Sequence, residues 1–219
     1  MLSRHFIMAI PFIRSYPMPA PDSFPVNKVA WKLDPSRTAL LIHDMQRYFL
    51  RFYETDSGLL QTLIGNIATL KRWAAAHDVP VFYTAQPHDQ PASDRALLND
   101  MWGPGLTKAD PAQQAVVPEI APVEGDVVLT KWRYSAFQRS DLDTRMKALK
   151  RDQLIIVGVY AHIGCMITAV EAFMKDIQPF MVGDAVADFS EEEHRMALKY
   201  VATRCGVVTS CQEITDIQP

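Results

Sequence analysis

The sequence lacks the features that mark secreted, membrane and nucleic-acid-binding proteins. It has only three cysteines, an odd number in a chain of 219 residues that needs no disulfides to fold, so we expect a reducing compartment and a cytoplasmic location. Its longest apolar runs, such as 38–42 and 154–159, are far shorter than the roughly 20 residues of a membrane helix. Its 22 basic and 25 acidic side chains leave a net charge of −3, without the basic excess that attracts nucleic acid. We therefore expect neither a membrane nor a nucleic acid as a partner.

Proline is unevenly distributed, and this divides the chain. Six prolines fall within residues 9–36, a density that excludes a helix interior or a central strand. Apolar residues are scattered among these prolines, so we predict that residues 1–36 form an extended arm that packs on the domain. The remaining sequence predicts a single domain over residues 37–212 and a short C-terminal tail over residues 213–219.

Beyond the arm, segments typical of buried strands alternate with segments in which apolar residues recur every three or four positions. Most strand-like segments are almost entirely apolar, which is typical of parallel strands with helices on both faces. The pattern predicts an α/β fold, a Rossmann-like three-layer sandwich with a six-stranded, mainly parallel sheet. The predicted strands are 38–44, 79–84, 126–130, 153–158, 180–182 and 206–209, and the predicted helices include 60–74, 93–102, 163–174 and 190–204.

Polar residues follow the first four predicted strands. An acid, an amide and a base come after three of them, at Asp44, Gln86 and Lys131, and a tight turn around Gly164 comes after the fourth. Taken one at a time, these residues fit ordinary roles as a helix cap, a loop hydrogen bond or a salt-bridge partner. Ligands of open parallel sheets bind at the carboxyl ends of the strands. Because these strand ends share one edge, the coincidence predicts a functional site there.

Seven short motifs then give the sequence a family resemblance. They are His43-Asp-Met-Gln46, Tyr83-Thr-Ala-Gln-Pro87, Asp94-Arg-Ala-Leu-Leu98, Trp102-Gly-Pro-Gly105, Thr130-Lys-Trp-Arg-Tyr-Ser-Ala-Phe137, Gly158-Val-Tyr-Ala-His-Ile-Gly-Cys165 and Val186-Ala-Asp-Phe-Ser190. Together they resemble the isochorismatases of catecholate siderophore synthesis, over about residues 8–212. They are similar, slightly less closely, to the amino-deoxyisochorismatases of phenazine synthesis. Both groups belong to the isochorismatase-like hydrolase superfamily, whose fold is the sandwich predicted above.

The resemblance implies an enzyme, a hydrolase that acts on an ether bond. It would cleave the enolpyruvyl vinyl ether of isochorismate to pyruvate and 2,3-dihydro-2,3-dihydroxybenzoate, in siderophore biosynthesis. A vinyl ether is cleaved by protonation of carbon and addition of water, so the reaction needs neither a nucleophilic side chain nor a cofactor. The resemblance assigns the proton donor to Asp44 and its partner to Lys131. A nearby ammonium group favours the carboxylate over the acid, so desolvation and the substrate's own carboxylates would have to offset Lys131.

The resemblance also implies residues that bind the substrate. Arg95 suits bidentate capture of a carboxylate, and Gln86 can donate to the same anion. Gly164 is grouped with Asp44 and Lys131 as a catalytic residue. Its backbone N–H would donate to an anion, and its lack of a Cβ would leave room for the substrate ring. The expected walls of the pocket, which are equally consistent with core positions, are Tyr160, Trp102, Tyr134 and Tyr48.

The cysteines and histidines are interpreted as structural, and no metal site is predicted. In the cysteine hydrolases of the superfamily an Asp, a Lys and a Cys cooperate, and the position that matches the nucleophile is Gly164 here. Cys165 follows one residue later, about 100° around the helix, so we expect it to be a small buried residue. Asp44 is not followed by the Asp-x-His pattern of metal-dependent nicotinamidases. His43 and His162 are expected to satisfy core or loop contacts.

Several alternatives stay open. An amino group in place of a ring hydroxyl would make the enzyme a 2-amino-2-deoxyisochorismate hydrolase of phenazine biosynthesis, and the sequence barely separates the two substrates. A cysteine amidohydrolase that uses Cys165, and a non-catalytic binding module, are less well supported. We expect no aryl carrier domain in this chain, which favours the phenazine alternative somewhat. From the family we expect a homodimer or a larger homo-oligomer.

Overall fold

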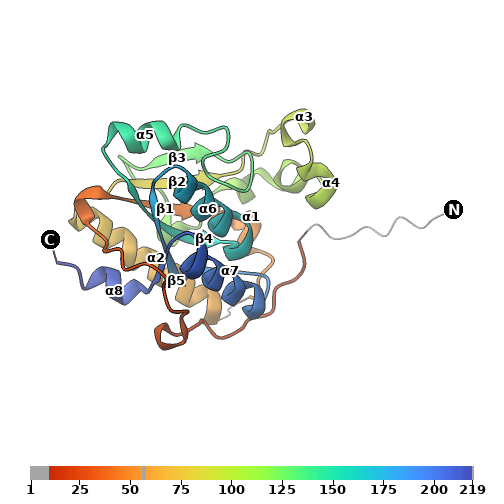
Figure 1. Ribbon diagram of the computed structural model, residues 1–219. Helices are drawn as coiled ribbons and strands as arrows, with labels where there is room; N and C mark the ends of the chain where they lie inside the picture. Colours follow the sequence, from red (N-terminus) through yellow and green to blue (C-terminus); the bar gives the residue numbers. More distant parts are fainter. Residues whose placement is uncertain (1–9, 56–57, 219) are drawn as a thin grey trace.

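The computed structural model describes residues 10–55 and 58–218. Its centre is one six-stranded sheet with the order β3-β2-β1-β4-β5-β6, in which every neighbouring pair is parallel. This confirms the predicted α/β class, and the sheet is wholly rather than mainly parallel. The strands, shown in Figure 1, are β1 (Thr38–His43), β2 (Val81–Ala85), β3 (Val127–Thr130), β4 (Gln153–Val159), β5 (Gln178–Ala187) and β6 (Val207–Thr209).

Eight α-helices accompany the sheet in the described part of the chain. They are α1 (Arg47–Leu50), α2 (Gly58–Ala76), α3 (Ala92–Arg95), α4 (Leu98–Trp102), α5 (Leu142–Ala148), α6 (Met166–Met174), α7 (Glu191–Arg204) and α8 (Cys211–Thr215). A π-helical turn, Ala161–Cys165, leads from β4 into α6.

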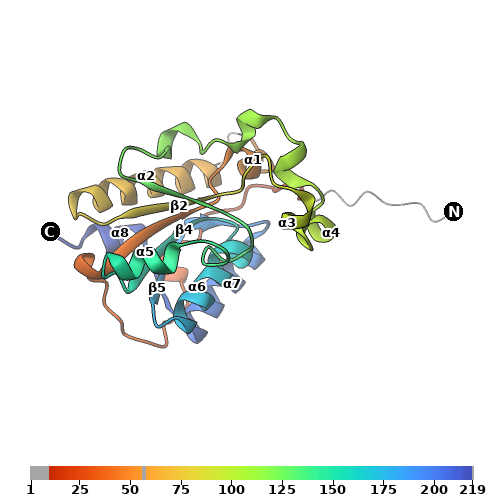
Figure 2. The ribbon, with the colours of Figure 1, turned by 90° about the horizontal axis from the view of Figure 1, so that it is seen from above.

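The helices cover both faces of the sheet, because successive side chains of a strand point to opposite faces. In β1, Leu40 and Ile42 belong to one buried apolar cluster, whereas Ala39 and Leu41 belong to another. Residues of α2 and α8 complete the first cluster, and residues of α5, α6 and α7 complete the second. Figure 2 shows α2 on one side of the sheet and these last three helices on the other. The predicted three-layer sandwich is therefore the observed one.

Two predicted elements differ in the structure. The predicted helix 93–102 is two short helices, since Ala96 has a φ of 47° that ends the first of them. Figure 1 shows α3 and α4 standing apart from the rest of the fold. The predicted strand 180–182 is a small part of β5, which continues to Ala187 past the polar Asp184. That polar residue fits because its carboxylate accepts a hydrogen bond from the N–H of Cys211 at 2.8 Å.

The described part of the predicted arm, residues 10–36, packs on the domain. Ile13 is fully buried, and its N–H donates to the carbonyl oxygen of Phe52 at 2.7 Å. The side chain of Asn27 bonds both the N–H and the carbonyl oxygen of Val208, each at 2.8 Å, at the edge strand β6. Residues 1–9 of the predicted arm lie outside the described residues.

Helix α8 crosses the boundary predicted at residue 212 between the domain and the tail. A capping box begins this helix: the Ser210 hydroxyl accepts from the N–H of Glu213, and the Glu213 carboxylate accepts from the N–H of Ser210. Ile214 is buried in the first apolar cluster, so the packed domain extends beyond residue 212. Among the described helices, none combines the length and the apolar character needed to cross a membrane.

Candidate active site

A pocket lies where the strands of the sheet end. The chain runs from β1 through β2 to β3 and then returns to place β4 on the other side of β1, so the strand order reverses beside β1. Such a reversal is where open α/β sheets bind ligands. All nine residues predicted as catalytic or substrate-binding line this one pocket.

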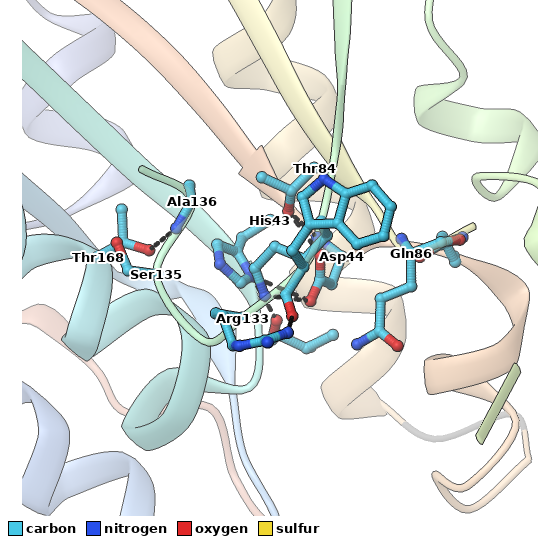
Figure 3. Close-up of polar contacts among 12 residues, drawn as sticks. His43, Asp44, Thr84, Gln86, Arg133, Ser135, Ala136 and Thr168 are labelled. Atoms are coloured by element: carbon cyan, nitrogen blue, oxygen red, sulfur yellow. Dashed lines mark hydrogen bonds and ion pairs between the residues drawn. The ribbon is translucent and has the colours of Figure 1, made fainter. Parts of the chain in front are cut away.

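Asp44 holds its carboxyl group at the floor of the pocket. The residue directly follows β1 and has a φ of 50°, a conformation that Asp tolerates better than most residues. Its Oδ2 accepts from Nζ of Lys131 at 3.0 Å, and its Oδ1 accepts from the hydroxyl of Thr84 at 2.6 Å (Figure 3). Only 8% of the Asp44 side chain and 4% of the Lys131 side chain are exposed. The acid and the base therefore form a buried ion pair in the pocket.

Strands β2 and β3 position the two partners of this pair. The hydroxyl of Thr84, in β2, also accepts from the backbone N–H of Asp44 at 3.1 Å. The backbone N–H of Lys131 donates to the carbonyl oxygen of Ala85 at 2.9 Å, which continues the pairing of β3 with β2 beyond the end of the strand. Thr84 was not predicted as a site residue. Its place at the end of the predicted strand 79–84 was the available signal.

Gly164 lies in the pocket wall, but its backbone does not do what the sequence predicted. Its N–H already donates to the carbonyl oxygen of Tyr160 at 3.1 Å, within the π-helical turn. The expected anion donor is therefore occupied, and this part of the prediction is wrong. The absence of a side chain serves His43 instead: a Cβ at Gly164 would lie 2.8 Å from both ring nitrogens of that histidine.

Arg95 and Gln86 form the side of the pocket that was predicted to bind a carboxylate. Arg95 is 4% exposed, and its Nε donates to the carbonyl oxygen of Gly103 at 2.8 Å. Its Nη1 lies 3.3 Å from Oε1 of Gln86. A Cβ at Gly105 would lie 2.6 Å from Nη2 of Arg95, so the guanidinium can pack here because residue 105 has no side chain. Burial lowers the pKa of Arg95, yet an arginine side chain stays charged.

Arg133 also lines the pocket, although it was not predicted as a site residue. Its Nη1 donates to the carbonyl oxygens of Asp94 and Trp132 at 2.9 and 2.6 Å. Within residues 10–55 and 58–218, neither Arg95 nor Arg133 forms an ion pair, whereas Lys131 is paired with the only acidic residue of the lining. Three basic side chains against one acidic side chain leave an excess of two positive charges, 3 − 1 = 2. A ligand with two carboxylates would balance this excess.

Aromatic and apolar side chains make the remaining walls. The four aromatic residues predicted there are all present, and two of them are joined, since Nε1 of Trp102 donates to the hydroxyl of Tyr134 at 2.8 Å. The Tyr160 hydroxyl donates to the carbonyl oxygen of Phe49 at 2.9 Å, so it can offer a ligand only its acceptor oxygen. Wall residues that the sequence analysis did not single out are Ile10, Phe49, Leu98, Ile163 and Phe189.

The same domain is found in known proteins. The isochorismatase domain family matches residues 38–213, which is most of the chain. The chain belongs to the isochorismatase family. Over 207 residues it is 56% identical to enterobactin synthase component B of Escherichia coli strain K12, covering 94% of this chain and 72% of that protein. It is 51% identical to the phenazine biosynthesis protein PhzD1 of Pseudomonas aeruginosa, covering 94% of this chain and 99% of that protein. Members of both groups that the sequence resembles are thus its relatives.

The fold is also shared with a cysteine hydrolase of Pseudomonas syringae pv. phaseolicola. Its solved structure matches with a TM-score of 0.79 and 26% identity, covering 89% of this chain and 97% of that one. In this isochorismatase-family chain Cys165 is fully buried in the second apolar cluster and does not line the pocket. Burial raises the pKa of the Cys165 thiol well above its usual value, which disfavours the reactive thiolate. The structure thus gives this thiol no route to a substrate in the pocket.

A second buried acid lies behind the pocket wall and was not predicted. Asp188, just after β5, accepts from Nδ1 of His162 at 2.6 Å and from the N–H groups of His162 and Phe189. Burial lowers the pKa of His162, but the hydrogen bond and charge of Asp188 outweigh it and raise the pKa overall. With Glu193 these two residues place possible metal-ligand atoms within 4.8 Å of one another. Both oxygens of the Asp188 carboxylate already accept hydrogen bonds from His162. We therefore interpret the cluster as a hydrogen-bonded His–Asp pair.

Proposed function

We propose that this isochorismatase-family enzyme hydrolyses the enolpyruvyl ether of isochorismate to pyruvate and 2,3-dihydro-2,3-dihydroxybenzoate. The observation that carries the proposal is the charge pattern of the pocket. One buried carboxyl group stands beside an excess of two positive charges, and two of the three basic side chains have no acidic partner among the described residues. Isochorismate brings one carboxylate on its ring and one on its enolpyruvyl group, and so matches that excess.

The geometry supports acid catalysis by Asp44. Its carboxyl group donates a proton to the terminal methylene of the vinyl ether, which becomes a methyl group and leaves an oxocarbenium ion. Water adds to the cationic carbon and returns a proton to the carboxylate. The hemiketal hydroxyl then loses its proton, the bond to the ring oxygen breaks, and the ring oxygen takes up a proton, so that pyruvate and the dihydrodiol leave. No side chain forms a covalent bond to the substrate in these steps.

The substrate itself resolves the conflict between a proton donor and a neighbouring lysine. The ammonium group of Lys131 lies 3.0 Å from Oδ2 of Asp44, and its positive charge attracts the carboxyl oxygen. A bound dianion places two negative charges in the same buried space, which favours the neutral form of the acid. We propose that Asp44 takes up its proton as the substrate binds, and that Lys131 and Thr84 then hold the protonated group in place.

The 2-amino analogue of isochorismate is the second candidate substrate. The observation in its favour is the relationship to PhzD1, which is 51% identical over 207 residues. The analogue contains the same vinyl ether and the same two carboxylates, so the residues named above would act on it in the same way. The two candidates differ in a single ring substituent, and therefore in pathway rather than in mechanism.

Pyruvate release, coupled to lactate dehydrogenase, tests both candidates. Wild type, Asp44→Asn, Asp44→Ala and Cys165→Ala are assayed on isochorismate and on its 2-amino analogue without added metal. We expect the Asp44 variants to lose at least a thousandfold in turnover and Cys165→Ala to stay within about twofold of wild type. The better substrate identifies the pathway. Full turnover by Asp44→Asn, or no pyruvate from either substrate, would overturn the proposal.

We also propose a homodimer or larger homo-oligomer in the cytoplasm. The family resemblance supports the first, and three free, buried cysteines support a reducing compartment for the second. Light scattering on the purified chain measures the mass in solution, and a monomer at all concentrations would contradict the proposed assembly.

A further inference from the structure

His43 and Gly164 compete for one volume beneath the pocket. His43 is the last residue of β1, is fully buried, and directly precedes Asp44. A Cβ built on Gly164 would collide with Cε1 of the imidazole and lie 2.8 Å from Nδ1 and from Nε2. Non-bonded contacts of this kind do not occur between real side chains. The ring of His43 therefore already fills the place where any side chain at position 164 would begin.

The imidazole is held where it is by its own contacts. Its Nδ1 lies 3.0 Å from the carbonyl oxygen of Val159, and since a carbonyl can only accept, Nδ1 carries the proton. The same nitrogen lies 3.6 Å from Oδ2 of Asp44. The backbones of β1 and β4 are also pressed together here, because a Cβ at Gly158 would lie 2.8 Å from the backbone nitrogen of His43. The ring cannot withdraw from Gly164 without breaking these contacts.

The charge of the ring fits its position. Burial is the main cause that lowers the pKa of His43 to about 4, so the imidazole is neutral near pH 7. A neutral ring adds no further positive charge beside Asp44, which already faces Lys131. His43 can thus fill space next to the acid without favouring the carboxylate form.

We propose that His43 is a specificity-determining residue: by filling the volume next to Gly164 it prevents any side chain, including a nucleophilic one, from projecting into the pocket from position 164. The site is thereby restricted to chemistry in which a solvent molecule attacks. Only the statement that a solvent molecule attacks the substrate rests on the proposed function. The steric part of the inference concerns the free protein and can be tested without substrate.

The first test is a double-mutant cycle on thermal stability. Gly164→Ala is made in wild type, in a His43→Asn background and in a His43→Gln background. Asn keeps a side-chain N–H near the position of Nδ1 but lacks the atoms corresponding to Cε1 and Nε2, whereas Gln keeps the length. Gly65→Ala, in α2 with open space around the added Cβ, is the matched control.

We expect Gly164→Ala to lower the melting temperature by at least 8 °C in the wild-type and Gln backgrounds, and by less than half as much in the Asn background. The Gly65 control should stay within about 2 °C. If protein is recovered folded only in the Asn background, the result supports the proposal equally. An equal loss in all three backgrounds, or failure to fold in all three, would overturn it, as would a Gly164→Ala protein as stable as the Gly65 control.

The second test asks whether emptying the volume admits a nucleophile. Gly164→Cys is made alone and with His43→Asn, and the folded proteins are treated with iodoacetamide, which forms an S–C bond, releases iodide and leaves the thiol proton to solvent. We expect the new thiol of the double variant to react at least tenfold faster than the buried Cys165 in His43→Asn alone. A single variant that melts like wild type and reacts as fast as the double variant would overturn the proposal. Pyruvate release by wild type is unaffected by either result, so failure here leaves the proposed function standing.

Discussion

One hydroxyl group holds both ends of Asp44. Oγ1 of Thr84 accepts a hydrogen bond from the backbone N–H of Asp44 at 3.1 Å and donates one to its Oδ1 at 2.6 Å. Thr84 and His43 are paired in the register of β1 and β2, so the sheet itself places this hydroxyl beside the residue that follows β1. The orientation of the acid thus depends on the pairing of two strands as well as on Lys131.

Replacement of Thr84 by Val should therefore reduce turnover more than it reduces binding. Val keeps the shape of the side chain and removes both hydrogen bonds, so the acid loses its fixed orientation. We expect kcat for pyruvate release to fall about tenfold, with KM changed by less than threefold. Thr84→Ser, which keeps the hydroxyl, is the control and should retain most of kcat. Equal kinetics for the Val and Ser variants would show that this hydroxyl does not orient the acid.

Replacement of Gly105 by Ala should weaken substrate binding through Arg95. Both Gly103 and Gly105 have positive φ values, of 62° and 57°, but an added Cβ meets open space at Gly103 and the Arg95 guanidinium at Gly105. Gly103→Ala thus reports the effect of backbone strain, and any additional effect of Gly105→Ala comes from displacement of Arg95. We expect KM to rise about tenfold in the Gly105 variant and by less than threefold in the Gly103 variant. Similar KM values in the two variants would contradict this account.

Arg133 should be needed for ligands with two carboxylates. We expect Arg133→Met to raise KM for the dicarboxylate substrate by about 10- to 100-fold, since a charge-assisted hydrogen bond contributes roughly 1.5–3 kcal/mol. Arg139→Met is the matched control, because Arg139 also bonds the carbonyl oxygen of Asp94 but does not line the pocket. If both variants raise KM equally, Arg133 acts by holding the α3 segment and not by binding the substrate.

The order of the strand and helix patterns was enough to predict the sheet and the edge at which the pocket lies. Asp44, Gln86 and Lys131 could be placed together because parallel strands end at one edge, and the structure brings them into one pocket. The role of Thr84 could not be read in this way. Its function depends on strand register, since a shift of one residue would turn its side chain to the other face of the sheet.

The interpretation of Gly164 failed for a related reason. A glycine at the start of a helical segment predicts a free N–H, but the π-helical turn uses that N–H internally, and the turn type is not encoded in any local pattern. The atom that excludes a side chain there belongs to His43, which is 121 residues away in the sequence, 164 − 43 = 121. By contrast, the start of α7 was readable, because Ser190 stands before three glutamates as a helix-capping residue, and its hydroxyl accepts from the N–H of Glu193.

Two buried neutral histidines should make the protein lose stability in mild acid. Burial is the main cause that lowers the pKa of both His43 and His194 to about 4, below the value near 6.5 that an unfolded chain would have. Between about pH 4 and pH 6.5 the unfolded state therefore binds more protons than the folded state. The free energy of unfolding falls as the pH falls through this range, and above pH 7 these two groups no longer change it. Each group contributes up to about 3 kcal/mol of this loss.

His194 offers the cleaner test, because it does not line the pocket and has defined hydrogen-bond partners. Its Nε2 donates to the carbonyl oxygen of Gly183 at 2.9 Å, which leaves Nδ1 to accept from the hydroxyl of Tyr16 at 3.0 Å. Protonation of Nδ1 would remove that acceptor and loosen the arm at Tyr16. His194→Gln can keep a donor and an acceptor but does not titrate, so urea unfolding at pH 7.5, 6.0, 5.0 and 4.5 should show a smaller loss of stability than in wild type. A pH dependence identical to that of wild type would mean that His194 is not held neutral in the folded protein, and the acid sensitivity would then have to come from other groups.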